Sequence, residues 1–152
     1  MKRLLFLDVD GVLNDLTVLS TREELGVHHL QNLKMIVCAT KCDIVLSSSW
    51  RILEDWKRTL RLAFEEHQIP LWISETPRIT SENMEIIPRS REIISWLVDN
   101  SINNAKVVVL DDEADACIKN HDLPTIQDKF IHTCMNFGLT SDKAQEAINF
   151  LK

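Results

Sequence analysis

Two aspartates, Asp8 and Asp10, directly follow a run of apolar residues near the start of the chain. The run, Leu4 to Leu7, has the length and character of a buried strand in a parallel sheet. Strand alternation directs both carboxylates to the same side, and like charges held so close need a divalent cation, a proton or a basic side chain beside them. Gly11 allows the chain to turn sharply as it leaves the strand.

Two further apolar segments, 43–46 and 107–110, also end in polar side chains. The residues that follow are Ser47, Ser48 and Ser49 after the first segment and Asp111 and Asp112 after the second. The carboxyl ends of parallel strands meet at one edge of a sheet, where open α/β folds bind their ligands. We therefore expect the carboxylates, the hydroxyls and a nearby arginine to form one site. Oxygen ligands of this kind suit Mg²⁺, which in turn would hold a phosphoryl group.

Patterns in the rest of the chain predict the elements that position these residues. Strands are expected at 3–9, 43–46, 70–74, 107–110 and 129–132, and helices at 28–40, from Trp50 or Arg51 onward, from Pro88 and after Thr140. Segment 12–26 is expected to be a loop or small flap over the strand end, and 75–88 a loop. Strands that alternate with helices predict an α/β fold, a Rossmann-like three-layer sandwich with a mostly parallel sheet and helices on both faces.

The helix expected from Trp50 or Arg51 carries an apolar stripe and a basic face. The stripe consists of Ile52, Trp56, Leu60, Ala63 and Phe64. On the other side Arg51, Arg58 and Arg61 line up, either as a track for phosphate groups or as a solvated face. The solvated face is the better interpretation because Glu54 precedes Arg58 by four residues, the spacing of a helical ion pair. Trp50 and Trp56 are expected to pack rather than to stack on bases.

Composition limits the function classes further. The length of 152 residues predicts one domain, 1–152, and 45% hydrophobic with 26% charged residues is an ordinary globular balance. A net charge of −6 and a pI near 5.3 argue against a general polyanion binder. Because no apolar run approaches the roughly 18 residues of a membrane span, we expect no membrane contact. The four cysteines are expected to be reduced, mostly buried thiols, which is typical of a cytoplasmic location. Cys38 and Cys42 lack further ligands at zinc spacing, and the three glycines exclude GxGxxG and Walker loops.

Three of these segments resemble motifs of the haloacid dehalogenase (HAD) superfamily. The segment DVDGVLN is similar to the first motif, IVLSSSW to the second, and VVVLDD to the fourth in its double-aspartate form. Together with RSREIISWL and the tail FIHTCMNFGLTSDKAQEAINFL, nearly the whole chain resembles small capless members, including the HAD domain of Swiss Army Knife RNA repair proteins. The resemblance implies a magnesium-dependent phosphatase, a phosphoric monoester hydrolase, with no full cap domain.

The resemblance also implies roles for the aspartates. Asp8 would be the nucleophile that forms an aspartyl phosphate and would contact the metal. Asp10 would protonate the leaving oxygen, then activate water, and its backbone carbonyl would ligate Mg²⁺. Asp112 would be the better metal ligand of the acidic pair, with Asp111 orienting it or sharing the role.

The remaining roles belong to hydroxyls and a basic residue. Ser47 would hydrogen-bond a phosphoryl oxygen, with Ser48 as the next candidate. The third motif requires a Lys or Arg to neutralise developing charge. Arg89 is chosen because its RxxEI pattern resembles the small family, and Arg91 and Lys106 are rivals.

An uncapped site favours a bulky phosphorylated substrate, such as a nucleic-acid end or a protein, and the oligomeric state stays open. Three other functions are weighed. A phospho-accepting signalling domain would carry its acceptor aspartate on a middle strand, where this chain has Ser47. A catalytically silent phosphate- or metal-binding domain would keep the same acids. Carbon–halogen cleavage shares the nucleophile but needs no metal, so the pair Asp111 and Asp112 counts against it.

Overall fold

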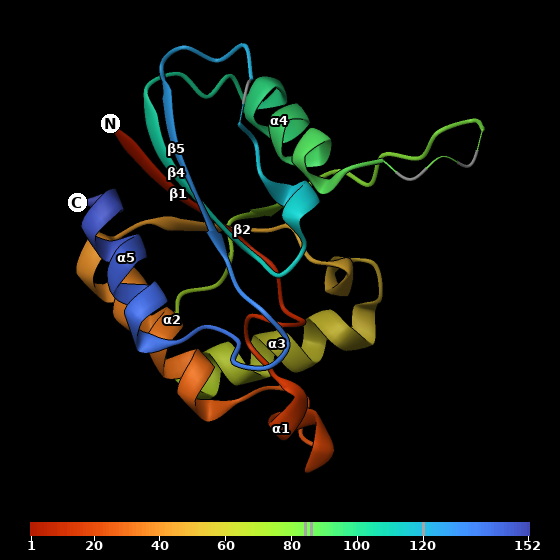
Figure 1. Ribbon diagram of the computed structural model, residues 1–152, viewed down its shortest axis with the longest axis vertical. Helices are drawn as coiled ribbons and strands as arrows, with labels where there is room; N and C mark the ends of the chain where they lie inside the picture. Colours follow the sequence, from red (N-terminus) through yellow and green to blue (C-terminus); the bar gives the residue numbers. More distant parts are fainter. Residues whose placement is uncertain (84, 86, 120) are drawn as a thin grey trace.

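The computed structural model describes residues 1–83, 85, 87–119 and 121–152. Within them, five strands form one sheet in the order β3-β2-β1-β4-β5, and all neighbours are parallel (Figure 1). The strands are β1 (Lys2–Leu7), β2 (Asp43–Leu46), β3 (Ser74–Glu75), β4 (Ala105–Asp111) and β5 (Ile126–His132). The predicted α/β, Rossmann-like fold with a parallel sheet is confirmed.

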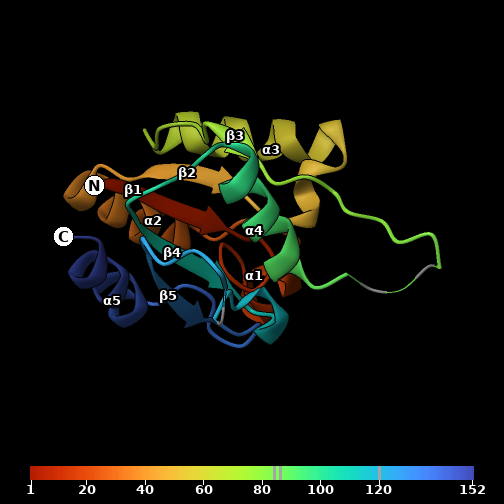
Figure 2. The same ribbon diagram turned by 90° about the horizontal axis from the view of Figure 1, so that it is seen from above.

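Helices cover both faces of this sheet. They are α1 (Leu16–Ser20), α2 (Val27–Thr40), α3 (Glu54–Glu66), α4 (Arg89–Asp99) and α5 (Ser141–Leu151). Figures 1 and 2 show α4 on one side of the sheet and α2 and α5 on the other. Each face has its own core, because Leu5 and Leu7 of β1 pack with α2, α3 and α5, whereas Leu4 and Phe6 pack with α4. This alternation is the period of two expected of a strand that is buried on both faces.

The register of the central strands brings the predicted site residues together. Leu7 of β1 pairs with Leu46 of β2 on one side and with Leu110 of β4 on the other. The next residue along each of these three segments therefore lies at the same level, at the carboxyl edge of the sheet. These residues are Asp8, Ser47 and Asp111.

The helix predicted to open at Trp50 or Arg51 begins later than expected. A 3₁₀ turn occupies Ser49–Arg51, and Leu53, with extended backbone dihedrals, separates it from α3. The predicted apolar stripe is therefore only half right. Ile52 and Trp56 are 43% and 42% exposed, while Leu60 and Phe64, one and two turns further on, are fully buried.

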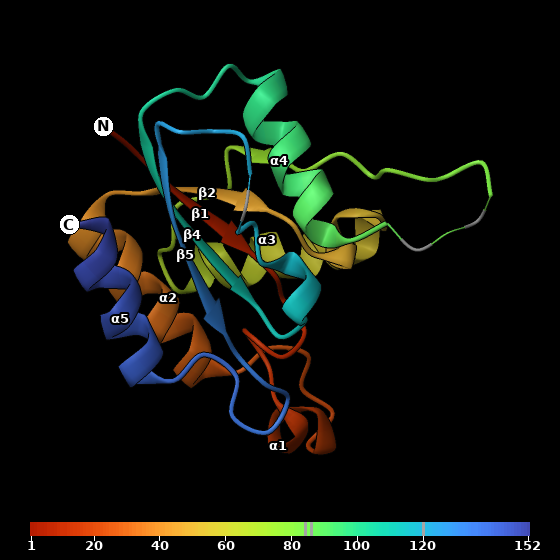
Figure 3. The same ribbon diagram turned by 45° about the horizontal axis from the view of Figure 1, so that its top comes forward.

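The predicted bounds were also wrong for four strands, and the first of them, expected at 3–9, is β1 and ends at Leu7. The strand expected at 70–74 is the short β3, Ser74–Glu75, and the strands predicted at 107–110 and 129–132 begin two and three residues earlier. Of the loop predicted at 75–88, residues 84 and 86 lie outside the described residues. The described residues from 76 to 83 run outward from the body of the molecule (Figure 3).

The flap predicted at 12–26 contains the five-residue helix α1, which lies beyond the carboxyl ends of the strands (Figure 1). Its backbone is held by Leu16 N–H, which donates to Met135 O at 2.8 Å, and by Gly26 N–H, which donates to Leu13 O at 2.8 Å. In the described parts of the chain, no cap domain stands over the sheet, as predicted. None of the helices described there is long and apolar enough to cross a membrane.

Candidate active site

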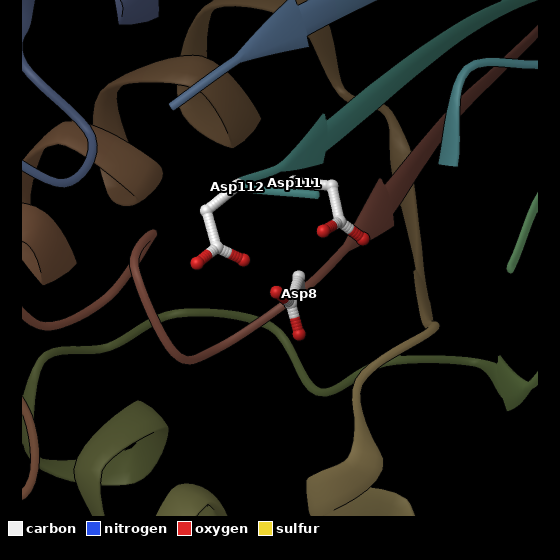
Figure 4. A group of neighbouring side chains, drawn as sticks. All are labelled: Asp8, Asp111 and Asp112. Atoms are coloured by element: carbon white, nitrogen blue, oxygen red, sulfur yellow. The ribbon is translucent and has the colours of Figure 1, made fainter. Parts of the chain in front are cut away.

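Three carboxylates converge at the carboxyl edge of the sheet. Asp8 follows β1, Asp111 ends β4 and Asp112 follows it, and Figure 4 shows the three side chains around one common space. One oxygen of each lies within 4.8 Å of the others. Asp8 and Asp111 are almost completely buried, at 4% and 0% exposure. Carboxylate oxygens are the ligands that Mg²⁺ prefers, so this group fits the predicted magnesium site.

Arg89, the predicted basic residue of the third motif, lies against two of these acids. Its Nη1 is 3.1 Å from Asp8 Oδ1 and 2.8 Å from Asp111 Oδ2. Arg89 is the first residue of α4, and the packing of α4 on the sheet brings it there. The rivals lie elsewhere: Arg91 is exposed, and Lys106 Nζ lies 5.9 Å from the Phe150 ring centroid.

Charge in this cluster is only partly balanced, because the cluster holds three carboxylates and the single guanidinium beside it contacts two of them. Burial raises the pKa of Asp8 well above its usual range, and the neighbouring Asp111 raises it further against the opposing effect of Arg89. Burial also raises the pKa of Asp111. Burial opposes the charge of Arg89, but the attraction of Asp8 and Asp111 outweighs it and raises the Arg89 pKa. A divalent cation between the carboxylates would relieve this repulsion.

Asp10 lies outside the three-carboxylate cluster, and its side chain is exposed. Its Oδ1 accepts hydrogen bonds from Asn14 Nδ2 at 2.9 Å and from Trp50 Nε1 at 3.2 Å. Asn14 is fully buried and also accepts from Gly11 N–H at 2.9 Å. Sequence reasoning missed Asn14, although its place four residues after Asp10 is the spacing of a side-chain contact across one turn. The metal contact predicted through the Asp10 carbonyl stays a prediction.

Gly11 is needed at the site for space as well as for the turn. Its φ of +73° is a left-handed conformation that glycine adopts without strain. A Cβ there would lie 2.6 Å from Cγ of Asp112, which is too close for two carbon atoms. Gly11, in the first motif, therefore leaves room for the carboxylate of Asp112, in the fourth motif.

The three serines after β2 have different environments. Ser47 Oγ is fully buried and has no hydrogen-bond partner among the described residues. Ser48 Oγ accepts from Trp50 N–H at 3.1 Å and so caps the 3₁₀ turn. Ser49 Oγ is 3.5 Å from Arg89 Nη2. An unsatisfied buried hydroxyl costs roughly 1–3 kcal/mol, and the Thr76 and Thr133 hydroxyls share this feature with Ser47.

Arg51 was predicted to share a solvated face with Arg58 and Arg61, and this was wrong for Arg51. It lies in the 3₁₀ turn, so the helical phase of α3 does not apply to it. Its side chain is buried and pairs with Glu92 at 2.9 Å. Arg61 does form an exposed pair with Glu54, at 2.6 Å. Sequence reasoning missed the buried pair because its members are 41 positions apart.

Comparison with known proteins identifies the family. The family described as the HAD domain in Swiss Army Knife RNA repair proteins matches residues 4–144. Neither the curated proteins nor the solved structures gave a significant match. The match covers nearly the whole chain and includes every residue of the acid cluster, Ser47 and Arg89. The chain therefore belongs to the family of HAD domains found in Swiss Army Knife RNA repair proteins.

Proposed function

We propose that this protein is a magnesium-dependent phosphatase that works through an aspartyl-phosphate intermediate. Its family membership suggests a phosphohydrolase-type function. The observation that carries the proposal is the convergence of Asp8, Asp111 and Asp112 with the guanidinium of Arg89. The site thus gathers a carboxylate that can attack phosphorus, carboxylates that can hold a metal cation, and a guanidinium that can bind phosphoryl oxygens.

Asp8 and Asp10 perform the two covalent steps. In the first step an Asp8 oxygen bonds to phosphorus, the bond from phosphorus to the leaving oxygen breaks, and Asp10 gives that oxygen a proton. In the second step Asp10 takes a proton from water, the water oxygen bonds to phosphorus, and the bond to Asp8 breaks. The hydrogen bonds from Asn14 and Trp50 support this role because they fix the orientation of the Asp10 carboxyl.

The other residues hold the phosphoryl group. Arg89 binds phosphoryl oxygens as their charge develops, and the unpartnered hydroxyl of Ser47 donates to one of them. Asp8 and Asp112 would hold Mg²⁺, with Asp111 orienting Asp112 or sharing its role. When bound, Mg²⁺ supplies positive charge that lets an anionic nucleophile approach an anionic phosphate.

A phosphorylated nucleic-acid end is the substrate that the surroundings of Asp10 favour. Asp10 acts on the leaving oxygen, so the leaving group lies on the side of Trp50, which binds Asp10. The exposed indole of Trp56 lies beside Trp50, with 6.2 Å between the ring centroids. Exposed aromatic rings are the platforms on which single-stranded bases stack. The absence of a cap domain among the described residues leaves room for such a substrate.

A phosphatase panel tests the proposal. Small phosphomonoesters and 5′- or 3′-phosphorylated oligonucleotides are offered to the wild type and to Asp8→Asn, with Mg²⁺ or with a chelator. We expect turnover of the oligonucleotides that both the substitution and the chelator abolish. Stable phosphorylation without turnover would instead favour a phospho-accepting domain. A clear preference for the small esters would contradict the proposed substrate while leaving the reaction intact.

A further inference from the structure

The buried pair of Arg51 and Glu92 lies next to the residues proposed to bind phosphate. The two side chains are only 6% and 11% exposed, and Arg51 Nη2 is 2.9 Å from Glu92 Oε2. The same guanidinium donates to four backbone carbonyl oxygens. These are Ser47 at 3.4 Å, Ser48 at 2.8 Å, Thr76 at 3.0 Å and Pro77 at 3.4 Å.

These contacts join three segments that are far apart in the sequence. Ser47 and Ser48 form the exit of β2, and Thr76 follows β3. Glu92 belongs to the first turn of α4 and also accepts from the backbone N–H of Ile79 at 2.9 Å. Arg51 therefore fixes the exit of β2 against both the exit of β3 and the start of α4.

The start of α4 is also where Arg89 lies. Glu92 comes three residues after Arg89, so the two side chains leave neighbouring points of one helical turn. Whatever holds Glu92 in place holds the base of Arg89 as well. On the other side of the pair, Arg51 binds the carbonyl of Ser47, whose own hydroxyl has no partner. The pair thus connects the two groups that would bind phosphoryl oxygens.

Stability alone does not explain why the chain keeps this pair. Burying two charges costs desolvation energy, and apolar residues of similar size often give equal or greater stability. The pattern of contacts is more specific, because only the planar, five-donor guanidinium can reach carbonyls in the segments after two strands and a carboxylate at once. A lysine would keep the charge of Arg51 and lose most of these bonds.

We propose that Arg51, held by Glu92, is a positioning residue that sets the Ser47 hydroxyl and the Arg89 guanidinium at the separation needed to bind one phosphoryl group. This inference rests on the proposed phosphatase function. Arg51 acts through its neighbours and does not touch the reacting atoms. Its removal should therefore weaken the contribution of Ser47 more than it weakens the fold.

A double-mutant cycle in the full chain tests this coupling. Ser47→Ala is measured alone and together with Arg51→Lys, by kcat and KM with Mg²⁺ and by calorimetric binding of inorganic phosphate. In the matched control, Ser47→Ala is combined with Arg61→Lys, a substitution that alters the exposed pair of Arg61 with Glu54. If Arg51→Lys does not fold, as judged by its melting temperature, Glu92→Gln takes its place, because it loosens the same pair from the other side.

We expect Ser47→Ala to lower kcat/KM about 10- to 100-fold in the wild type, but less than about threefold in the Arg51→Lys background. In the Arg61→Lys background the full loss should remain. Equal losses in all backgrounds, with the wild type active, would overturn the positioning role and leave the proposed function standing. If the wild type binds phosphate but shows no turnover, the same double-mutant cycle is evaluated from the dissociation constants for inorganic phosphate. If the wild type neither binds phosphate nor turns over a substrate, both proposals are wrong.

Discussion

Two groups of charges, one around the buried Asp8 and one around the partly buried Asp15, differ in how completely they are satisfied. In the first, Asp8, Asp111 and Asp112 lie together, and the Arg89 guanidinium contacts Asp8 and Asp111. In the second, Asp15 Oδ2 lies 2.8 Å from His29 Nε2, and Asp15 Oδ1 accepts from Val18 N–H at 2.8 Å. The second group holds α1 against α2 with a partner for each carboxylate oxygen, whereas the first leaves charge without balance.

The pKa values of the two aspartates move in opposite directions for this reason. Burial would raise the pKa of Asp15, but the Val18 N–H and His29 outweigh it, so the pKa falls below its usual value. Burial and the Asp111 charge raise the pKa of Asp8. The surroundings of Asp15 thus stabilise its charged form and the fold together. The surroundings of Asp8 destabilise its charged form, which is expected of a residue proposed to act on a ligand.

The largest effect is expected for Asp8→Asn. Turnover should fall at least about 10³-fold, because the nucleophile is lost. The melting temperature of the metal-free protein should nevertheless rise at neutral pH. A folded-state pKa above the unfolded value means that ionised Asp8 opposes folding, and this cost is absent in acid and grows as pH rises through the folded pKa. Calorimetry with a chelator measures the shift.

The control for this prediction is Asp55→Asn, which changes an exposed aspartate of α3. It should alter neither turnover nor melting temperature beyond experimental error. Retained turnover in Asp8→Asn, or a fall in its melting temperature at neutral pH, would show that the acid cluster is an ordinary structural ion network.

Metal binding should stabilise the first group of charges and leave the second unchanged. At a Mg²⁺ concentration 100 times its dissociation constant, we expect a gain of about 2.7 kcal/mol in the free energy of unfolding. Asp112→Asn should remove most of that gain because it deletes a ligand. Thermal melts across a Mg²⁺ series measure it, and a wild type indifferent to Mg²⁺ would contradict the magnesium assignment.

Asp15→Asn should have the opposite signature to Asp8→Asn. We expect a loss of about 1–3 kcal/mol in the free energy of unfolding at neutral pH, because a partly buried charge with two hydrogen-bond partners is removed. The stability supplied by Asp15 is present above the usual aspartate pKa and is lost as pH falls through its lowered folded-state value. Urea unfolding at pH 7 and below pH 4 should therefore show the difference from wild type shrinking in acid. A difference that grows in acid would reverse this interpretation.

The smallest effect is expected at the edge of the site. Trp56→Ala should raise KM for a phosphorylated oligonucleotide about fivefold, because one stacked base is worth roughly 1–3 kcal/mol. Its KM for a small phosphomonoester should stay unchanged. Leu62→Ala is the control, since Leu62 is 56% exposed on the same helix. Equal changes for both substrates would remove Trp56 from the substrate surface.

Local patterns sufficed to predict the residues of the first group. Apolar runs that end in acids, at Asp8 and Asp111, follow directly from strand burial and from the convergence of parallel strands. Arg89 was placed through the family resemblance, because no local rule tells which basic residue folds over an acid cluster. These residues lie together in the structure.

Long-range contacts could not be predicted in the same way. The pair of Asp15 and His29 joins a flap to a helix start, and nothing in either segment specifies the other. Arg51 was misplaced because the chain interrupts its helix at Leu53 without a proline or glycine to mark the break. A two-residue strand such as β3 is too short to show a period.

The close approach of Gly11 to Asp112 has a consequence for anyone who redesigns this protein. Any side chain at position 11 would have to occupy the space of the acid opposite. The two positions therefore form a single unit of variation, although 101 positions of sequence separate them. A library that randomises position 11 alone should recover only the parent glycine, whereas libraries that vary both positions can reshape the acid cluster.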